Sequence, residues 1–373
     1  RRPVGPDRRR QAGATMTPEM QKAYADAAVP FYERGGAITA EVCRVNHWRV
    51  FLEVNSACTL RCPTCTKGNV EGYDHKNGFM DWSLMERILD KIKAENPGAI
   101  VFTYGNSEPF VHPKLPEVIR AIKSRGLHAE MSTNLNHLNR VEELLEAGPE
   151  LIIISLSGFT QDVYVKGHAG GNIEKVKANM RIVADTNNAL PADKRVKMLV
   201  NYHVYNDNAH EVELMRQYAE GMGIGFFTSL ARAISMENSI QYCRAHDPNA
   251  TPFEVQPGRP DWNEAFPPAG EKYAAAMARV RIKPTDAQTM YAHHPLHPVC
   301  PVGAGSLFTF IRHDGKVQLC ACTADRRITL GDFLDLTPDQ MIEQRTGHSV
   351  CGQCIKYRLN LYFMIADREQ WIP

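Results

Sequence analysis

Short apolar segments alternate with amphipathic helical segments six times between residues 49 and 239, and this alternation limits the possible folds most strongly. The predicted strands are Arg49 to Asn55, Ile100 to Tyr104, Leu127 to Thr133, Leu151 to Leu156, Val196 to Tyr205 and Ile224 to Leu230. Helical periodicity fills the intervals between them. Parallel strands need crossover helices, and these crossovers are right-handed. The pattern therefore predicts an α/β protein whose parallel sheet curves into a partial barrel, with function at the carboxyl ends of the strands.

Three cysteines follow the first predicted strand within eight residues, at Cys58, Cys62 and Cys65. A closed metal site has four protein ligands, whereas three thiolates can hold a 4Fe-4S cluster and leave one iron open. A zinc site completed by a distant residue such as a histidine is the alternative. We expect a cluster with an open position at the carboxyl edge of the sheet.

The CxxxCxxC spacing of these cysteines resembles the signature of the radical S-adenosylmethionine (SAM) superfamily. This resemblance implies a partial (β/α)6 TIM-like barrel, a SAM-binding 4Fe-4S cluster and a 5′-deoxyadenosyl radical that abstracts a substrate hydrogen. It also implies an external one-electron reductant such as flavodoxin or ferredoxin. Two positions depart from the family pattern: Asn106 and Ser107 replace the second glycine of a Gly-Gly-Glu-Pro motif, and Thr64 stands where an aromatic residue often precedes the third cysteine.

The same resemblance assigns SAM-binding residues to the ends of the second, third and fourth strands. The turn before Pro109 looks like the motif that contacts the methionyl amino group, and polar residues farther along resemble those that hold the ribose and carboxylate. These residues are Tyr104, Gly105, Asn106, Ser107, Glu108, Ser132, Thr133, Asn134, Ser155 and Ser157. A turn or cap role is the alternative for Ser157.

Five more cysteines lie near the C-terminus, at Cys300, Cys320, Cys322, Cys351 and Cys354. Two alternating segments, Ser306 to Arg312 and Lys316 to Ala321, flank an Asp-Gly turn and predict a hairpin, with Cys320 and Cys322 on one face of its second strand. The predicted helix Ile355 to Asp367 follows the last cysteine pair.

This C-terminal arrangement resembles the twitch domain, a short relative of the SPASM domain, in which a hairpin and a helix bind an auxiliary cluster. The resemblance assigns Cys300, Cys320, Cys351 and Cys354 to a second 4Fe-4S cluster. Replacement of one of the four by Cys322 stays open, and so does a structural zinc site with the same ligands.

Cys243 stands apart from both groups, in a proline-rich segment after the sixth strand. We expect this segment to be a loop that covers the substrate or links two domains. A thiol can return a hydrogen atom to a carbon radical, and antibiotic-pathway epimerases that resemble this architecture use a cysteine in this way. A packed, inert cysteine and an auxiliary ligand are the alternatives for Cys243. Cys43 is expected to be structural.

Composition sets the domain limits and excludes some partners. Residues 1–15 carry five Arg and one Asp, so without them the formal charge changes from +1 to −3, which gives no basic surface for nucleic acid. The sequence shows no membrane segment and no signal peptide, which predicts a cytoplasmic protein. The expected divisions are a segment at 1–15 that does not belong to the folded part, an extension at 16–48, the barrel at 49–239, the proline-rich segment at 240–290 and the twitch-like domain at 291–373.

The resemblance includes enzymes that act on several substrate classes. Sugars and aminocyclitols of natural products are favoured, with epimerisation if Cys243 donates hydrogen and dehydrogenation if it does not. A peptide maturase is the alternative, and only about thirty residues between Met16 and the first strand argue against a leader-binding domain. An iron-sulfur electron carrier is the alternative outside enzymes, although it has no use for a SAM site.

Overall fold

A computed structural model describes residues 49–70, 78–266, 268–292, 300 and 308–365. Their strands form a single sheet in the order β6-β5-β4-β3-β2-β1-β7-β8-β9. The first six strands are mutually parallel. They are β1 (Arg49–Leu52), β2 (Ile100–Phe102), β3 (His128–Thr133), β4 (Leu151–Leu156), β5 (Lys197–Val204) and β6 (Gly225–Leu230). The predicted six parallel strands of a partial TIM-like barrel are confirmed. Cys43 and the predicted segments 1–15 and 16–48 lie outside the described residues.

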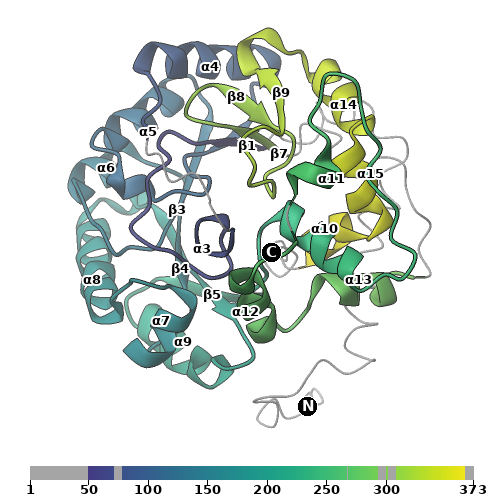
Figure 1. The fold of residues 1–373 in the computed structure, drawn as a ribbon. Coiled ribbons are helices and arrows are strands. Elements are labelled where there is room, and N and C mark those ends of the chain that lie inside the picture. Colours follow the sequence, from purple (N-terminus) through teal and green to yellow (C-terminus); the bar gives the residue numbers. More distant parts are fainter. Residues whose placement is uncertain (1–48, 71–77, 267, 293–299, 301–307, 366–373) are drawn as a thin grey trace, which may run out of the picture.

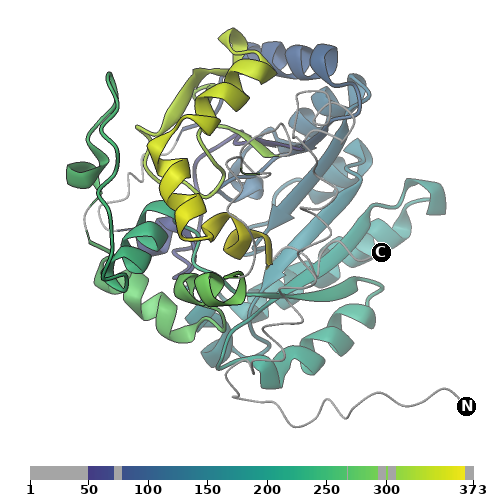
Figure 2. The same ribbon diagram turned by 90° about the vertical axis from the view of Figure 1, so that its right-hand side faces the viewer.

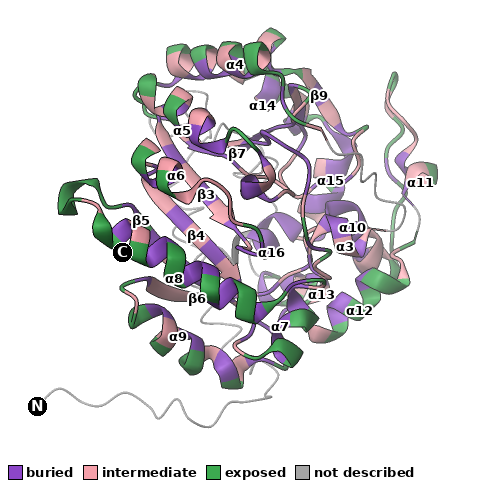
Figure 3. Cartoon of the chain, turned by 90° about the vertical axis from the view of Figure 1, so that its left-hand side faces the viewer, coloured by how far each residue is buried: buried purple, intermediate pink, exposed green. Residues whose placement is uncertain are grey.

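Helices cover the outer face of this parallel sheet, as Figure 1 shows. They are α4 (Trp82–Glu95), α5 (Leu115–Ser124), α6 (Val141–Ala147), α7 (Gln161–Gly167), α8 (Ile173–Ala189) and α9 (Val212–Glu220). In Figure 3 their solvent side is exposed and their sheet side is buried. Each of the five intervals between the predicted strands contains at least one of these helices, as expected, and the interval after β4 contains two, α7 and α8.

The inner face of the sheet is aromatic on its central strands. Alternate residues of β1, such as Val50 and Leu52, belong to the apolar core. The ring of Phe51 stacks on Phe102 at 4.8 Å and on Phe308 at 5.8 Å between centroids. Because successive strand residues point to opposite faces, the same short strands supply both an outer helical core and an inner aromatic layer.

The C-terminal strands extend the barrel sheet rather than form a sheet of their own. They are β7 (Phe308–Ile311), β8 (Lys316–Gln318) and β9 (Thr329–Asp332), and β7 pairs parallel with β1. The β7–β8 pair confirms the predicted hairpin, although β8 ends at Gln318. Cys320 and Cys322 therefore lie in the turn after the strand, so their predicted place on one strand face is wrong. The strand β9 was not predicted.

The proline-rich segment is also more helical than predicted. It contains α10 (Met236–Ala245), α11 (Trp262–Ala265), α12 (Glu271–Arg279) and α13 (Pro284–Met290). The prolines begin at Pro248, beyond the end of α10, and the side chain of Ser235 caps this helix by accepting from the Asn238 amide at 3.3 Å. The prediction that Cys243 lies in a loop is therefore wrong.

The last part of the chain folds into α14 (Pro338–Thr346), α15 (Ser349–Lys356) and α16 (Leu359–Ile365). The predicted helix from Ile355 is divided, because Arg358 has a left-handed φ of 56° between α15 and α16. Figures 1 and 2 show these helices on the side of the molecule opposite α5 and α6. Within the described part of the chain, no helix is long and apolar enough to cross a bilayer.

Candidate active site and cysteine pocket

The first cysteine group forms a loop that follows β1 at the carboxyl end of the parallel strands. The loop leads into the short helix α3 (Thr66–Asn69), and its turn is closed by the Cys65 amide, which donates to the Cys62 carbonyl at 3.0 Å. Burial raises the pKa of the Cys58 thiol to about 11 and that of Cys62 well above its ordinary value. The neighbouring thiols raise these pKa values further, so the three cysteines lie close enough to interact electrostatically.

Two residues directly after the loop shape it, and the sequence motifs did not single them out. The Nζ of Lys67 donates to the Ser56 carbonyl at 2.7 Å, and its charge lowers the pKa of Cys58. A Cβ on Gly68 would lie 2.1 Å from the Cys62 carbonyl oxygen, so only glycine fits there. A buried cation close to thiols favours their ionised form, which is the form that binds metal.

Glu108 connects the second and third strands at the same edge. Its carboxylate accepts from Thr133 Oγ1 at 2.7 Å, from the Asn134 amide at 2.8 Å and from the Phe110 amide at 3.2 Å. Glu108 is only 1% exposed. Burial raises its pKa to about 7 despite these three hydrogen bonds. An ionised carboxylate has about four acceptor positions, so this one keeps room for a further donor.

Asn134 joins this carboxylate to the cysteine loop. Its Nδ2 lies 3.8 Å from Cys58 Sγ and 3.4 Å from Thr59 Oγ1. The Oγ of Ser107 is buried and has no hydrogen-bond partner among the described residues. An acceptor-rich carboxylate, an unused hydroxyl and three thiols at one edge suit a ligand with an amino group bound beside a metal cluster.

The remaining residues of the 104–108 turn pack closely against the inner aromatic layer. Tyr104 contacts Phe51 edge to face, with centroids 5.5 Å apart. A Cβ on Gly105 would lie 2.3 Å from the Phe310 ring, so this position accepts no side chain. Asn106 is half-buried beside them. The SAM contacts of these residues stay a prediction.

A polar row crosses the inner face from β3 to β6. Ser132 Oγ lies 3.0 Å from Ser155 Oγ, and Ser229 Oγ donates to Asn201 Oδ1 at 2.7 Å. Ser155 and Asn201 are partners in the β4–β5 register, which makes the row continuous. Ser157 is different, because its buried hydroxyl already contacts His168 Nδ1 at 2.6 Å. The SAM contact of Ser157 and the alternative turn or cap role both stay predictions.

The second cysteine group lines one small cavity. Its cysteines are Cys300, Cys320, Cys322, Cys351 and Cys354, joined by the side chains of Met236, Leu319, Thr323, Val350, Asn360 and Phe363. The pKa of Cys354 is raised well above its usual value, mainly by burial and further by Cys300, Cys351 and Cys320. The four predicted ligands therefore lie together, and Cys322 lies with them.

Two buried charged residues frame this cavity and were not anticipated from the sequence. Arg345 donates from Nε to the Leu319 carbonyl at 3.0 Å. A hydrogen bond with Cys322 is the largest cause that lowers the pKa of Cys320 to about 7, and the Arg345 charge adds to it. Burial raises the pKa of Cys351, and the Arg345 charge opposes this shift. Glu237 of α10 accepts from the Ala324 amide at 2.8 Å and from the Asp325 amide at 2.9 Å. These contacts attach the turn that carries Cys320 and Cys322 to α10 and α14.

No three His, Cys, Asp or Glu side chains among the described residues gather closely enough to hold a single metal ion. A four-iron cluster holds its thiolates farther apart, since each thiolate binds a different iron. The fit of the second group to a cluster therefore depends on its common cavity, and the fit of the first group depends on the mutual electrostatic effects of its thiols.

Cys243 lies inside α10, and its side chain is fully buried. Burial raises the pKa of its thiol to about 12, whereas a hydrogen bond to Gln288 lowers it. The helices α13 and α16 pack against α10. This environment is that of a packed cysteine, so the structure gives no support to hydrogen donation, which stays an untested prediction.

Known proteins resemble parts of this chain. A tungsten-containing aldehyde ferredoxin oxidoreductase cofactor-modifying protein of Pyrococcus furiosus is 28% identical over 181 residues, which cover 47% of this chain and 49% of that protein. A PqqA peptide cyclase of Granulibacter bethesdensis is 27% identical over 180 residues, which cover 46% and 43%. The chain spans less than half the length of these two curated relatives.

The crystal structure of Streptococcus suis SuiB bound to precursor peptide SuiA shares the fold, with a TM-score of 0.51, 11% identity and coverage of 90% of this chain and 84% of that one. The sequence model of the radical SAM superfamily matches residues 52–217, which include the three-cysteine loop and the strand ends β2 to β5. Domains of this family use a 4Fe-4S cluster and SAM. Residues 52–217 of this chain therefore form a radical SAM domain.

Proposed function

We propose that this chain is a radical SAM enzyme that oxidises a small polar substrate, such as a sugar or aminocyclitol unit of a natural product. Cys58, Cys62 and Cys65 would hold the SAM-binding 4Fe-4S cluster. Cys300, Cys320, Cys351 and Cys354 would hold a second 4Fe-4S cluster. The single observation that carries the proposal is the cavity in which these four cysteines meet, beside a barrel whose residues 52–217 match the radical SAM family.

When bound, the first cluster with SAM supplies a 5′-deoxyadenosyl radical that abstracts a hydrogen atom, and the second cluster supplies an electron acceptor. The chain itself positions and protects the reactants. Glu108 would accept a hydrogen bond from the amino group of SAM, and Asn134 would hold the ligand beside Cys58. Ser107 would contribute its buried hydroxyl.

The polar row on the inner face of the barrel supports a substrate rich in hydroxyl or amino groups. Ser155, Asn201 and Ser229 can each donate and accept hydrogen bonds, as sugar recognition requires. Dehydrogenation is preferred to epimerisation because the Cys243 thiol is buried within the packing of α10. The cavity also lies next to the barrel, since the Met236 amide after β6 donates to the Cys322 carbonyl at 2.7 Å.

Peptide modification is the second candidate. Two similar proteins are named for peptide chemistry: the PqqA peptide cyclase relative and SuiB, whose structure holds a precursor peptide. A non-catalytic iron-sulfur carrier is disfavoured by the buried Glu108 and its contacts, which an electron carrier does not need. The cytoplasmic location and the external one-electron reductant remain predictions.

The first test is anaerobic reconstitution, followed by iron and sulfide counting and by dithionite-driven SAM cleavage in the same sample. About eight irons per chain with release of 5′-deoxyadenosine would support both clusters. Aminocyclitols, sugars and peptides would then be screened for faster SAM cleavage and for loss of two hydrogens by mass spectrometry. A product formed only from peptides would replace the small-molecule proposal, and absence of SAM cleavage with every substrate would overturn the enzyme assignment.

A further inference from the structure

Thr64 lies between two of the three cysteines of the loop and is held at both its side chain and its backbone. Its Oγ1 lies 2.9 Å from the hydroxyl of Tyr205, and its carbonyl accepts from the Ile234 amide at 2.7 Å. Thr64 itself is buried. Residues that follow β5 and β6 therefore hold the middle of a loop that follows β1.

Tyr205 is a rigid partner for this contact. Its amide donates to Asn208 Oδ1 at 2.7 Å, its carbonyl accepts from Arg281 Nε at 3.2 Å, and the guanidinium of Arg279 lies 4.5 Å from the centre of its ring. Burial raises the pKa of its hydroxyl, so the hydroxyl stays protonated and can donate. A side chain fixed at the backbone and at the ring places its terminal oxygen with little freedom.

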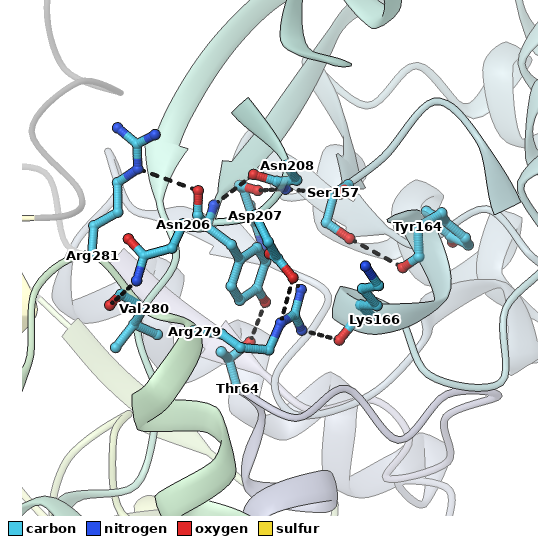
Figure 4. Close-up of polar contacts among 12 residues, drawn as sticks. Thr64, Ser157, Tyr164, Lys166, Asn206, Asp207, Asn208, Arg279, Val280 and Arg281 are labelled. Carbon is cyan, nitrogen blue, oxygen red and sulfur yellow. Dashed lines mark hydrogen bonds and ion pairs between the residues drawn. The ribbon is translucent and has the colours of Figure 1, made fainter. Parts of the chain in front are cut away.

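The end of α12 completes this arrangement, as Figure 4 shows. Arg279 donates to both carboxylate oxygens of Asp207, at 3.2 and 3.0 Å, and to the carbonyl of Lys166. Asn206 Nδ2 donates to the Val280 carbonyl at 3.2 Å. In addition, α12 packs against α3, the helix that starts at the third cysteine.

We propose that Tyr205 is a positioning residue for the cluster loop: its hydroxyl fixes Thr64 and, through Thr64, the placement of Cys62 relative to Cys65. The contact network of Arg279 holds Tyr205 in place. This inference rests on the proposed assignment of Cys58, Cys62 and Cys65 as cluster ligands.

The arrangement gives a physical reason for the threonine at position 64. The Tyr205 oxygen lies 2.9 Å from Thr64 Oγ1, so an aromatic side chain at position 64 would overlap the tyrosine. Both residues are buried, and a buried hydroxyl needs a partner. Thr64 and Tyr205 thus satisfy each other, and the loss of either hydroxyl leaves the other one unpaired.

The test compares Tyr205→Phe, Thr64→Val and the double variant, each reconstituted as the full chain. Iron extraction by a chelator is followed over time. Cys58→Ala should lack the first cluster, so the difference in iron content between the wild type and Cys58→Ala defines the iron pool of that cluster. We expect each single variant to lose this pool about three- to tenfold faster than the wild type, as for one ordinary hydrogen bond. The double variant should lose it no faster than the worse single variant, because both remove the same contact.

Two further variants separate positioning from general damage. Tyr273 is also a fully buried tyrosine with one hydroxyl partner, Ser239 Oγ at 2.7 Å, so Tyr273→Phe is a matched control that should leave this iron pool unchanged. Thr64→Ser keeps the hydroxyl and should restore the wild-type rate of iron loss. The EPR change on adding SAM to the reduced protein should weaken in Tyr205→Phe and Thr64→Val alone.

Wild-type iron loss in Tyr205→Phe would overturn the inference, and so would independent, multiplying effects in the double variant. Equal acceleration by Tyr273→Phe would also overturn it, since buried tyrosine hydroxyls in general would then be the cause. If Cys58→Ala kept all of its iron, the ligand assignment itself would fail. That result differs from a failure of Tyr205 positioning, and the readout needs no substrate.

Discussion

The two cysteine groups of this protein are built in different ways. The first occupies eight consecutive residues after β1 and offers three thiols beside polar strand ends. The second gathers thiols from three separate segments, around Cys300, the turn after β8 and α15, into a largely apolar cavity. Three thiols in a local loop would leave one iron of a bound cluster open for a small ligand, whereas an assembled cavity would surround its cluster. The difference suits chemistry at the first site and electron storage at the second.

Their electrostatic surroundings differ as well. Beside the first group stands Glu108, a buried carboxyl whose pKa burial raises to about 7. Beside the second stands Arg345, a buried cation whose charge favours the ionised form of Cys320 and Cys351, although burial raises the pKa of Cys351 overall. A carboxylate can accept hydrogen bonds from a bound cationic group, while an arginine offsets the negative charge of thiolates. Each neighbour therefore agrees with the function proposed for its site.

Replacement of Cys58 by alanine should have the largest effect. We expect reductive SAM cleavage to fall by at least about a thousandfold, because the cofactor carries this chemistry. About four irons should remain in the C-terminal cavity. Deoxyadenosine release and iron content measure the two results. Loss of all iron would show that the two sites do not load independently.

Cys351→Ala should separate the second site from the first. We expect loss of about four irons and of substrate oxidation, while SAM cleavage continues. Cys322→Ala is the matched control, since Cys322 lines the same cavity and is not among the proposed ligands. Iron content and product analysis distinguish the effects of Cys351→Ala and Cys322→Ala. If Cys322→Ala lost the iron and Cys320→Ala kept it, Cys322 would be the fourth ligand.

Glu108 should make SAM binding depend on pH. With a pKa of about 7, its ionised fraction rises from about one tenth at pH 6 to about nine tenths at pH 8, so the Kd for SAM should fall up to about tenfold. Glu108→Gln should remove this pH dependence. Anaerobic equilibrium dialysis measures the Kd. An equal change of the Kd with pH in the wild type and in Glu108→Gln would assign the pH dependence to another group.

The same pKa shift predicts a stability effect of opposite sign. Between the ordinary glutamate pKa of about 4.5 and about 7, the folded chain binds more protons than the unfolded chain. This contribution to stability is therefore complete at the lower pH and is lost as the pH rises through 7. The free energy of unfolding of the SAM-free wild type and of Glu108→Gln, measured at several pH values, would isolate the contribution of Glu108 to stability.

Cys243→Ala should have the smallest effect. Its thiol is packed within α10, so we expect the free energy of unfolding to fall by about 1 kcal/mol with SAM cleavage and product formation unchanged. Denaturant unfolding and product analysis test this. A variant that cleaves SAM and makes no product would restore Cys243 as a hydrogen donor and would favour epimerisation.

Most of the barrel could be predicted because its strands carry local signals. The segment Leu151–Leu156 is a run of apolar residues, and the structure has a strand at the same bounds. Prediction failed where long-range contacts decide the structure. The prolines from Pro248 onward suggested a loop, yet α10 ends before them and packs on α13 and α16. The break at Arg358 likewise interrupts an apolar pattern that suggested one helix.

The sequence by itself determined the class of this protein, because the spacing of Cys58, Cys62 and Cys65 is a property of consecutive residues. It also determined the parallel sheet, because strand and helix periodicities are local. Only the tertiary structure decided that β7 joins β1 in one sheet, that Cys322 shares a cavity with the four predicted ligands and that Tyr205 meets Thr64. The β1–β7 pairing joins residues more than 250 positions apart, and the Thr64–Tyr205 contact joins residues 141 positions apart, so the packing of the whole chain rather than a local pattern sets these partners.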